Sequence, residues 1–172
     1  MKLYEILKGS EYSLDLFSQD AIVELENRII ERTDKKGKTY PAVSCLVRNK
    51  EIKLTPEEIV RQLYAAKLIN DYGYPKSRLA FEYPIYFGRE TKRADIVIRD
   101  NDDANVAYII VELKKPKAKD GREQLKSYTH ATGASMAVWT NGMTIAYYQR
   151  QNPNYFKDIP NIPNVHQTLE DI

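Results

Sequence analysis

The spacing of apolar residues predicts helices in the first part of the chain. Between Ile22 and Ile30 they recur at intervals of three and four, as on one face of a helix, and Ser18 can cap its start. Thr55-Pro56-Glu57-Glu58 predicts a second helix start, with a cap, a proline at the first helical position and a glutamate at the third. The predicted elements are a helix over 19–32, a short strand over 42–47 and a helix from 56 to about 71.

After Gly73 the spacing of apolar residues changes to two, which is typical of strands. Asn141-Gly142 predicts a tight hairpin, because both positions tolerate positive φ. The fold class is therefore α/β (α+β), with a mixed central sheet flanked by helices. The predicted elements are strands over 79–87, 93–99 and 106–114, a helix over 119–132, and strands over 135–140 and 143–150.

Composition divides the chain into three parts. Residues 1–54 are expected to form an N-terminal helix and strand extension packed on the core, which comprises 55–150. In 151–172 the runs Gln-Asn-Pro-Asn and Ile-Pro-Asn-Ile-Pro-Asn predict a tail or linker, because proline disfavours long elements.

Charge and cysteine content limit the classes of protein. The 172 residues include 26 basic and 24 acidic ones, so overall charge does not indicate nucleic-acid binding, and any such surface must come from local clustering. The single cysteine, Cys45, excludes an intrachain disulfide and fits a reducing compartment. No apolar run approaches the roughly 20 residues that a membrane span needs. We therefore expect a cytoplasmic protein without a membrane partner.

The candidate chemistry lies on two neighbouring predicted strands. Residues i and i+2 of a strand share a face, so Glu112 and Lys114 project together, and the preceding turn can place Asp95 beside them. Two carboxylates at short range repel each other unless a cation joins them, and Mg²⁺ prefers such oxygens. A lysine beside the ion can orient attacking water. The alternative is a salt bridge on a solvated sheet face, which is common for Glu-x-Lys.

The helix that follows can support this site. Gln124 and Tyr128 are four residues apart and so share a face. A cationic strip for contacts with DNA phosphates would comprise Lys117, Lys119, Arg122 and Lys126, unless that surface only aids solubility. Glu58 is a possible metal ligand, although it can instead complete a capping box with Thr55. Arg61 and Gln62 follow on the same helix as Glu58, and the alternative to a role in the site is an exposed helix surface.

Taken in order, these residues resemble the PD-(D/E)xK nucleases and, more narrowly, the N-terminal nuclease domain of the restriction (R) subunit of type I restriction–modification enzymes. The resemblance covers about residues 55 to 150, and the ordered set is more specific than any single motif. It departs from the superfamily's name at Ala94, where proline is nominal. The motifs are Pro56-Glu57-Glu58, Val60-Arg61-Gln62, Tyr74-Pro75, Glu82, Lys92-Arg93-Ala94-Asp95-Ile96-Val97, Val111-Glu112-Leu113-Lys114-Lys115-Pro116, Gln124-Leu125-Lys126-Ser127-Tyr128 and Thr140-Asn141-Gly142.

The resemblance implies a restriction-endonuclease-like αβββαβ core and roles for its residues. Asp95, Glu112 and the main-chain carbonyl of Leu113 would hold Mg²⁺, and Lys114 would position the water that attacks the phosphodiester. Gln124 and Tyr128 would support the site or contact the DNA backbone. ATP would act only in a helicase motor, which this chain does not contain, so we expect an N-terminal piece or a short relative.

Three functions are compatible with this interpretation. The first is an endonuclease domain that cuts double-stranded DNA and leaves target choice to the methylation and specificity subunits. The second is a stand-alone nuclease of repair or of a mobile element. The third is a catalytically silent module that binds DNA or partner subunits. The complete set of Asp95, Glu112 and Lys114 favours an active enzyme.

Overall fold

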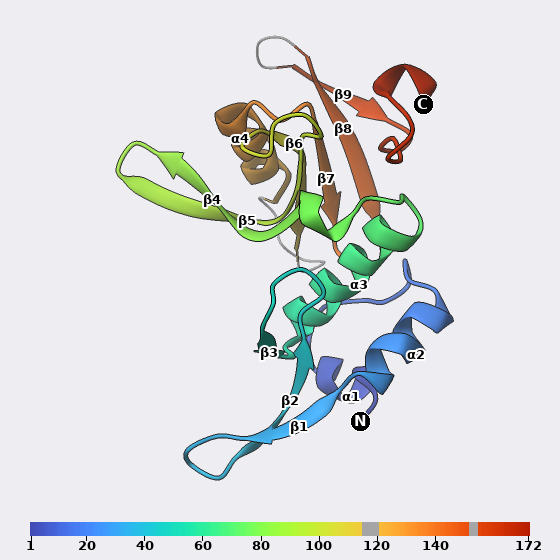
Figure 1. Cartoon of the computed structure of the whole chain (residues 1–172), viewed down its shortest axis with the longest axis vertical. Helices are drawn as coiled ribbons and strands as arrows, with labels where there is room; N and C mark the ends of the chain where they lie inside the picture. Colours follow the sequence, from blue (N-terminus) through green and yellow to red (C-terminus); the bar gives the residue numbers. More distant parts are fainter. Residues whose placement is uncertain (115–120, 152–154) are drawn as a thin grey trace.

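The protein contains two β-sheets joined by a central helix (Figure 1). The computed structural model describes residues 1–114, 121–151 and 155–172. The elements of these residues are α1 Leu3–Leu7, α2 Gln19–Asn27, β1 Ile30–Thr33, β2 Thr39–Ser44, β3 Glu51–Lys53, α3 Pro56–Asn70, β4 Leu79–Phe87, β5 Glu90–Arg99, β6 Ala107–Leu113, α4 Gly121–Thr132, β7 Met136–Thr140, β8 Ile145–Gln151 and β9 Tyr155–Ile159, with short 3-10 helices at Lys76–Arg78 and Leu169–Asp171.

The larger sheet is mixed, as the sequence predicts. Its strand order is β4-β5-β6-β7-β8-β9, and only β6 and β7 are parallel. Parallel neighbours need a long crossover, and α4 provides it. From α3 onward, the order of elements agrees with the predicted α, three strands, α and two strands. Within it, β5 begins at Glu90, three residues earlier than predicted.

Two helices cover opposite faces of this sheet. Alternate residues of a strand point to opposite faces, so Ile96 and Val111 pack with α3, whereas Val97 and Ile110 pack with α4. The core therefore has two layers, one on each side of the sheet.

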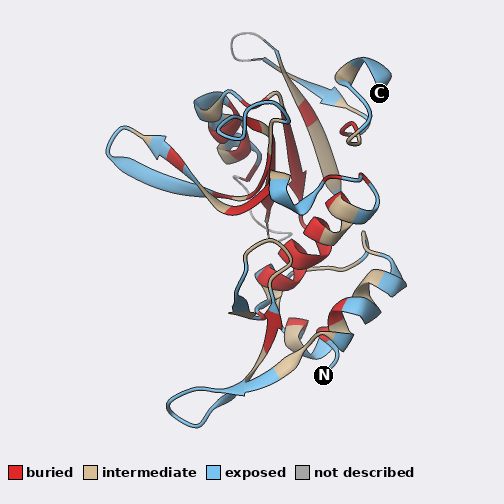
Figure 2. Ribbon diagram, viewed as in Figure 1, coloured by how far each residue is buried: buried red, intermediate tan, exposed pale blue. Residues whose placement is uncertain are grey.

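Helix α3 is buried on more than one side. Val60, Tyr64 and Leu68 pack on the large sheet, while Ile59 and Leu63 pack on α1, α2 and the small sheet. Figure 2 shows this helix largely buried between the two halves of the molecule. Polar residues of α3 are consequently enclosed as well, which decides the environment of the candidate site.

The N-terminal part differs from the sequence-based prediction. The helix expected over 19–32 ends at Asn27, and Ile30 begins a strand instead. Ile30 pairs with Ala42 in the small antiparallel sheet β1-β2-β3. Pairing between distant segments thus overrides the local helical spacing at the end of the predicted helix. The strand predicted over 42–47 is shifted, because β2 spans Thr39–Ser44.

The last residues are not the tail or linker that the prolines suggested. β9 pairs with β8 along its length, and Ile162 is fully buried in the core. The hydroxyls of Tyr72 and Tyr74 donate hydrogen bonds to the Asn161 side chain and to the carbonyl of Pro163, each at 2.6 Å. Proline limits the length of elements here, but a short strand and an irregular segment still pack on the core.

The loop between β7 and β8 is longer than the two-residue turn predicted from Asn141-Gly142. It spans residues 141–144, and the Asn141 side chain accepts hydrogen bonds from the main-chain N–H groups of Met143 and Thr144 at 2.9 and 2.7 Å. Gly142 has φ +84°, and a Cβ there would lie 1.9 Å from the carbonyl oxygen of Ser13. Glycine is therefore required by the close approach of the N-terminal segment.

Among the helices in the described parts of the chain, none combines the length and apolar character needed to cross a membrane.

Candidate metal and catalytic site

Asp95 and Glu112 lie side by side, in the middle of β5 and near the C-terminal end of β6. Ile96 is opposite Val111 in this antiparallel pair, which places Asp95 opposite Glu112. The main-chain N–H of Asp95 donates to Glu112 Oε1 at 3.3 Å, and the N–H of Leu113 donates to Asp95 Oδ2 at 2.8 Å. The structure thus brings together the two carboxylates that the sequence singles out.

The site is more enclosed than a solvated sheet face would be. The Glu112 side chain is only 2% exposed. The reason is that β5 and β6 are interior strands with a helix on each face. A salt bridge on a solvated sheet face, the alternative for Glu-x-Lys, therefore does not describe this pair.

Lys114 completes the group from the residue that follows β6. Its Nζ lies 3.4 Å from Glu112 Oε2, and its side chain is 26% exposed. Its main-chain N–H donates to the carbonyl of Thr140 at 2.9 Å, which fixes the start of the connection to α4. The ammonium group is therefore held beside Glu112 and remains open to solvent.

Burial and charge raise the pKa of Glu112 to about 8. Removal from water is the larger cause and the negative charge of Asp95 the next, while Lys114 acts in the opposite direction. Lys114 alone therefore does not compensate the two carboxylates.

Arg61 connects α3 to these strands and is buried, with its side chain 4% exposed. Burial alone would lower its pKa, but the surrounding carboxylates outweigh that effect and hold the pKa above its ordinary value. The alternative of an exposed helix surface at Arg61 and Gln62 is contradicted, because α3 is enclosed on this side. The guanidinium contacts four carboxylates: Glu58 at 2.6 Å, Glu57 at 2.8 Å, Glu82 at 2.9 Å and Asp95 at 3.0 Å.

The structure shows cationic and amide partners for Glu58, and a metal-ligand role for it stays a prediction. Thr55 Oγ1 accepts from the main-chain N–H of Glu58 at 3.3 Å, so the threonine half of the predicted cap is present. The Glu58 carboxylate, however, contacts Arg61, the amide of Gln62 at 3.1 Å and Arg48 at 3.5 Å. Because Arg61 binds both Glu58 and Asp95, its guanidinium stands between Glu58 and the Asp95–Glu112 pair.

Glu82 adopts a backbone conformation that is rare for its residue type. Its φ is +53°, and the pairing of β4 with β5 passes from Phe81↔Ile96 to Tyr83↔Ala94 without a Glu82–Asp95 pair. Non-glycine residues in this region are strained, and such strain is concentrated at functional sites. The irregularity directs the Glu82 carboxylate to Arg61, so the strained residue belongs to the charge cluster around Asp95.

Helix α4 contributes Tyr128 and Gln124. Burial raises the pKa of Tyr128, and the negative charges of Glu112 and Asp95 raise it further, as expected for a phenol near the carboxylates. Gln124 donates a hydrogen bond to the Tyr128 hydroxyl. Both residues line a groove between α4 and the β4–β5 hairpin, together with Phe87, Glu90, Lys92, Glu123 and Ser127.

Of the cationic strip expected on α4, Arg122 and Lys126 lie over different aromatic rings. Arg122 lies over the Trp139 ring, with its guanidinium carbon 5.0 Å from the centroid. Lys126 lies over Tyr148 and Phe156, at 5.8 and 5.9 Å, toward β8 and β9. The side chain of Lys126 therefore does not line the groove of Gln124 and Tyr128. Lys117 and Lys119 fall outside the described residues.

Residues 56–163 match a family model described as type I restriction enzyme R protein N terminus. The chain belongs to this family. The matched region contains α3, the candidate residues Asp95, Glu112 and Lys114, and β9, so it extends beyond the 55–150 core expected from the sequence. No match was found among curated proteins.

In this R-protein N-terminal region, Gly121, the first residue of α4, has a role that sequence reasoning missed. A Cβ there would lie 2.7 Å from Lys114 Cγ and 2.5 Å from Trp139 Nε1. Glycine therefore allows α4 to begin directly against the lysine of the site. A glycine at the start of a predicted helix was the only signal for this contact in the sequence.

Tyr12 brings the N-terminal segment to the same cluster. Its pKa is raised to about 12, first by burial and then by the negative charges of Glu57 and Asp95. Nothing in the local sequence predicts this proximity. It depends on how the segment between α1 and α2 packs on the core. By contrast, the spacing of Glu57, Glu58 and Arg61 along one helix would have indicated their ion pairs.

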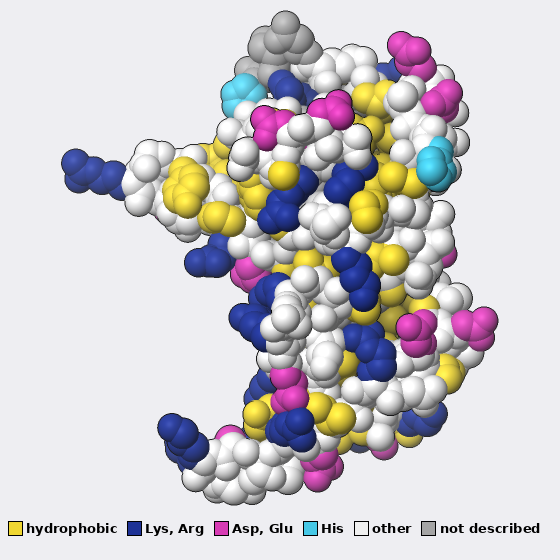
Figure 3. All heavy atoms as spheres, viewed as in Figure 1, with side chains coloured by type: hydrophobic (Ala, Val, Ile, Leu, Met, Phe, Trp, Pro, Cys, Tyr) yellow, Lys and Arg dark blue, Asp and Glu magenta, His cyan; other side chains and the backbone are white. Residues whose placement is uncertain are grey.

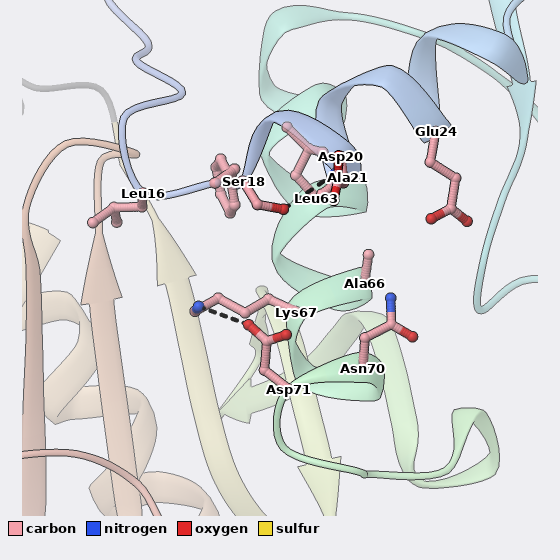
Figure 4. A pocket seen from close by; sticks show the side chains of 11 residues that line it. Leu16, Ser18, Asp20, Ala21, Glu24, Leu63, Ala66, Lys67, Asn70 and Asp71 are labelled. Atoms are coloured by element: carbon pink, nitrogen blue, oxygen red, sulfur yellow. Dashed lines mark hydrogen bonds and ion pairs between the residues drawn. The ribbon is translucent and has the colours of Figure 1, made fainter.

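A separate pocket lies between α2 and α3 (Figure 4). Three of its polar residues have structural partners, because Ser18 caps α2 and Lys67 pairs with Asp71 at 2.9 Å. It contains none of the residues proposed from the sequence for metal, catalysis or DNA. The candidate site is therefore the cluster around Asp95 and Glu112.

The donor set at this cluster fits a hard divalent cation. Each carboxylate oxygen of Asp95 and Glu112 has one contact with the protein, and a carboxylate has further lone pairs for a ligand. Within the three described ranges, no three His, Cys, Asp or Glu side chains are grouped to hold a metal. A site here would therefore use two carboxylates, the main chain and water, as Mg²⁺ commonly does.

Proposed function

We propose that this chain is the nuclease domain of a type I restriction enzyme R protein and hydrolyses phosphodiester bonds of double-stranded DNA with Mg²⁺. The observation that supports this most is the meeting of Asp95, Glu112 and Lys114 on adjacent strands. Burial and the negative charge of Asp95 raise the pKa of Glu112, so a bound cation would favour the ionised pair. The family match and the PD-(D/E)xK resemblance point to the same chemistry.

Asp95, Glu112 and the main-chain carbonyl of Leu113 would hold the ion. When bound, Mg²⁺ supplies the positive charge that keeps both carboxylates ionised and stabilises the phosphate in the transition state. Arg61 holds Asp95 Oδ1, and the N–H of Leu113 holds Oδ2, so the orientation of this carboxylate is fixed before any ligand arrives. Such preorganisation avoids rearranging the site during the reaction.

Lys114 is placed to act on the attacking water and on the phosphate. Its ammonium is near Glu112 and partly open to solvent, so it can donate a hydrogen bond to water at the site. Its charge would also offset the negative charge that develops on the phosphate. Tyr128 would lie at the α4 side of the site and contact the DNA backbone, and the hydrogen bond from Gln124 would hold its hydroxyl in place.

In this proposal the domain acts in the cytoplasm within a complex of several subunits. Target choice belongs to the specificity and methylation subunits, and ATP is used by a motor outside this chain. Phosphate contacts alone carry no sequence information, so the domain would cut without a sequence preference of its own.

The test is Mg²⁺-dependent cleavage of supercoiled plasmid by the assembled enzyme and by the isolated chain. Asp95→Asn, Glu112→Gln and Lys114→Met keep the side-chain shape and should each lower the cleavage rate by at least about 10²-fold. Lys76→Met, at an exposed lysine outside the site, is the matched control and should cleave normally. Near wild-type cleavage by any of the three would remove its proposed role.

Metal binding can be measured separately from activity. Trp139 is the only tryptophan and lies opposite Glu112 in the β6–β7 pairing, so its fluorescence should respond to Mg²⁺. Asp95→Asn and Glu112→Gln should remove that response. If Mg²⁺ binds normally but no cleavage occurs in the assembled enzyme, the chain is a silent binding module.

A further inference from the structure

Two β-hairpins extend beyond the sheets to which they belong. β1 and β2 pair from Ile30↔Ala42 to the turn, whereas β3 pairs only with residues 42–44. β4 and β5 pair out to Phe87↔Glu90, whereas β6 pairs with β5 only from Ile96 onward. We call residues 30–41 the first arm and residues 83–94 the second arm. At about 3.3 Å per residue, each extends roughly 20 Å from its sheet.

Both arms project from the same side of the molecule (Figure 1), and the surface between them is hollowed (Figure 3). Figure 3 shows Lys and Arg side chains at both tips and along the concave side between them. The arms are therefore two separate basic projections on a protein whose overall charge is close to neutral.

The candidate site lies where the two arms begin. The first arm joins α3 through Leu54, whose N–H donates to the carbonyl of Pro41 at 2.9 Å, and Glu57 follows in the first turn of α3. The second arm begins at Glu82 and Asp95. Arg61 bonds to Glu57, Glu82 and Asp95, so one side chain connects the bases of both arms.

The first arm presents three lysines on an ordered turn. Lys35, Lys36 and Lys38 are exposed in the loop between β1 and β2. Asp34 Oδ1 accepts the main-chain N–H groups of Lys36 and Lys38 at 2.8 and 2.9 Å. Gly37 provides the positive φ, +79°, that this turn needs. The acid of the loop is thus used to hold its shape, and the lysines remain available.

The second arm is basic at its tip and supported by α4 on one face. Arg89 lies in the turn, and Lys92 and Arg93 are exposed on β5, against one acid, Glu90. On the face toward α4, Ile85 is buried and the Phe87 ring lies 6.0 Å from that of Tyr128. The arm therefore keeps its position without a partner.

We propose that the two arms bind the phosphate backbone of duplex DNA on either side of the Asp95–Glu112 site and thereby place the scissile strand at the carboxylates. This inference rests on the proposed function and adds the surface through which DNA is held. A duplex carries one negative charge per about 1.7 Å of its axis, which exposed lysines and arginines can contact with release of counterions. A two-stranded ribbon also fits the major groove. The basic side chains at the tips lie about one arm's length from the acidic site. Their positive charge would offset the electrostatic repulsion between the acidic site and DNA.

The experiment measures DNA affinity without cleavage, by fluorescence anisotropy of a short labelled duplex of arbitrary sequence in EDTA. The first-arm variant combines Lys35→Glu, Lys36→Glu and Lys38→Glu, and the second-arm variant combines Arg89→Glu and Lys92→Glu. Each should raise Kd at least about tenfold and lower the salt slope of log K by about 1 to 3. The control combines Lys76→Glu with Lys157→Glu, two exposed lysines outside the arms, and should change Kd less than about twofold.

Unchanged affinity in both arm variants, or equal weakening in the control, would overturn the proposal, provided that circular dichroism shows all variants folded. Normal DNA affinity with lost assembly into the complex would also overturn it, because the arms would then bind protein. Preferred binding of single-stranded DNA or RNA probes would overturn the choice of duplex. Arm-dependent DNA binding without any Mg²⁺-dependent cleavage by the assembled wild-type enzyme would instead refute the proposed function and leave the proposal for the arms intact.

Discussion

At the scale of residues, the candidate site contains more negative than positive side chains. Arg61 is shared among several acids, and Lys114 contacts Glu112. Within the described residues, the linked acids are Glu57, Glu58, Glu82, Asp95 and Glu112, and the linked bases are Arg48, Arg61 and Lys114. Burial, and then the negative charge of Asp95, raises the pKa of both Glu57 and Glu112.

The raised pKa of Glu112 predicts a pH dependence of stability in the absence of metal. The folded protein keeps this proton up to pH about 8, whereas the unfolded chain loses it near the ordinary value of 4.5. Between these values unfolding releases a proton, so this contribution to the free energy of unfolding is complete below pH 4.5 and is lost as pH rises to about 8. The expected slope is on the order of 1 kcal/mol per pH unit.

Urea unfolding of wild type and Glu112→Gln in EDTA, at several pH values between the unfolded and folded pKa of Glu112, measures this slope. The difference in unfolding free energy between the two proteins should change steadily with pH, because a glutamine side chain at this position cannot ionise. A constant difference across that range would contradict the prediction. Other titrating groups cancel in the comparison as long as they are not coupled to Glu112.

Arg61 should be important for stability as well as for orientation. Removing one partner of a buried ion pair leaves uncompensated charge, so Arg61→Met should cost about 3–5 kcal/mol near neutral pH. Lys67→Met is the matched control, because Lys67 forms an ion pair of the same spacing on the same helix, with Asp71 at 2.9 Å, but is 30% exposed. That change should cost at most about 1 kcal/mol. If urea unfolding showed the same loss of unfolding free energy for Arg61→Met and Lys67→Met, the burial of Arg61 would not matter for stability.

At the scale of elements, α3 and α4 approach the site in different ways. α3 is enclosed by two apolar clusters and carries its polar residues inward, where they pair with one another. α4 has one buried face, on which Leu125 and Tyr128 lie, and its first residue contacts Lys114. The position of Lys114 therefore depends on how closely the start of α4 approaches β6 and β7.

Gly121→Ala tests that close approach. Alanine favours helices over glycine by about 1 kcal/mol, so a free helix position would gain stability. Here the added Cβ would collide with Lys114 Cγ and Trp139, and we expect a loss of about 1–3 kcal/mol and slower cleavage. Ser127→Ala, at an exposed position of the same helix, should change stability by less than about 0.5 kcal/mol. A gain in stability for Gly121→Ala would contradict the contact.

At the scale of the whole molecule, the segment that follows β9 packs on the main hydrophobic core, which includes residues of α3. Ile162→Ala should cost about 2–5 kcal/mol, because this side chain is fully buried among residues of the main cluster. Val106→Ala, at an exposed position, is the control and should be near neutral. The measurement is thermal and urea unfolding. A small effect at Ile162 would mean that the segment after β9 does not contribute to stability.

The strands β4 to β8, the crossover helix α4 and the residues Asp95, Glu112 and Lys114 were predictable from the sequence. A period of two fixes which residues of a strand share a face, so Glu112 and Lys114 could be paired without a structure. The turn between β5 and β6 then brought Asp95 to them. These conclusions depend on interactions between residues close in sequence, which local pattern describes well.

Tertiary structure alone decided the rest of the site and the ends of the fold. Arg61, Glu82 and Tyr12 reach Asp95 from three separate segments. Ile30 joins a strand, and the proline-rich end packs on the core, because partners distant in sequence compete with local preference. The sequence determined by itself which carboxylates could share an ion, since their spacing is local. The burial that raises the pKa of Glu112, and the arginine that holds Asp95, follow only from packing of α3 and α4 on opposite faces of the sheet.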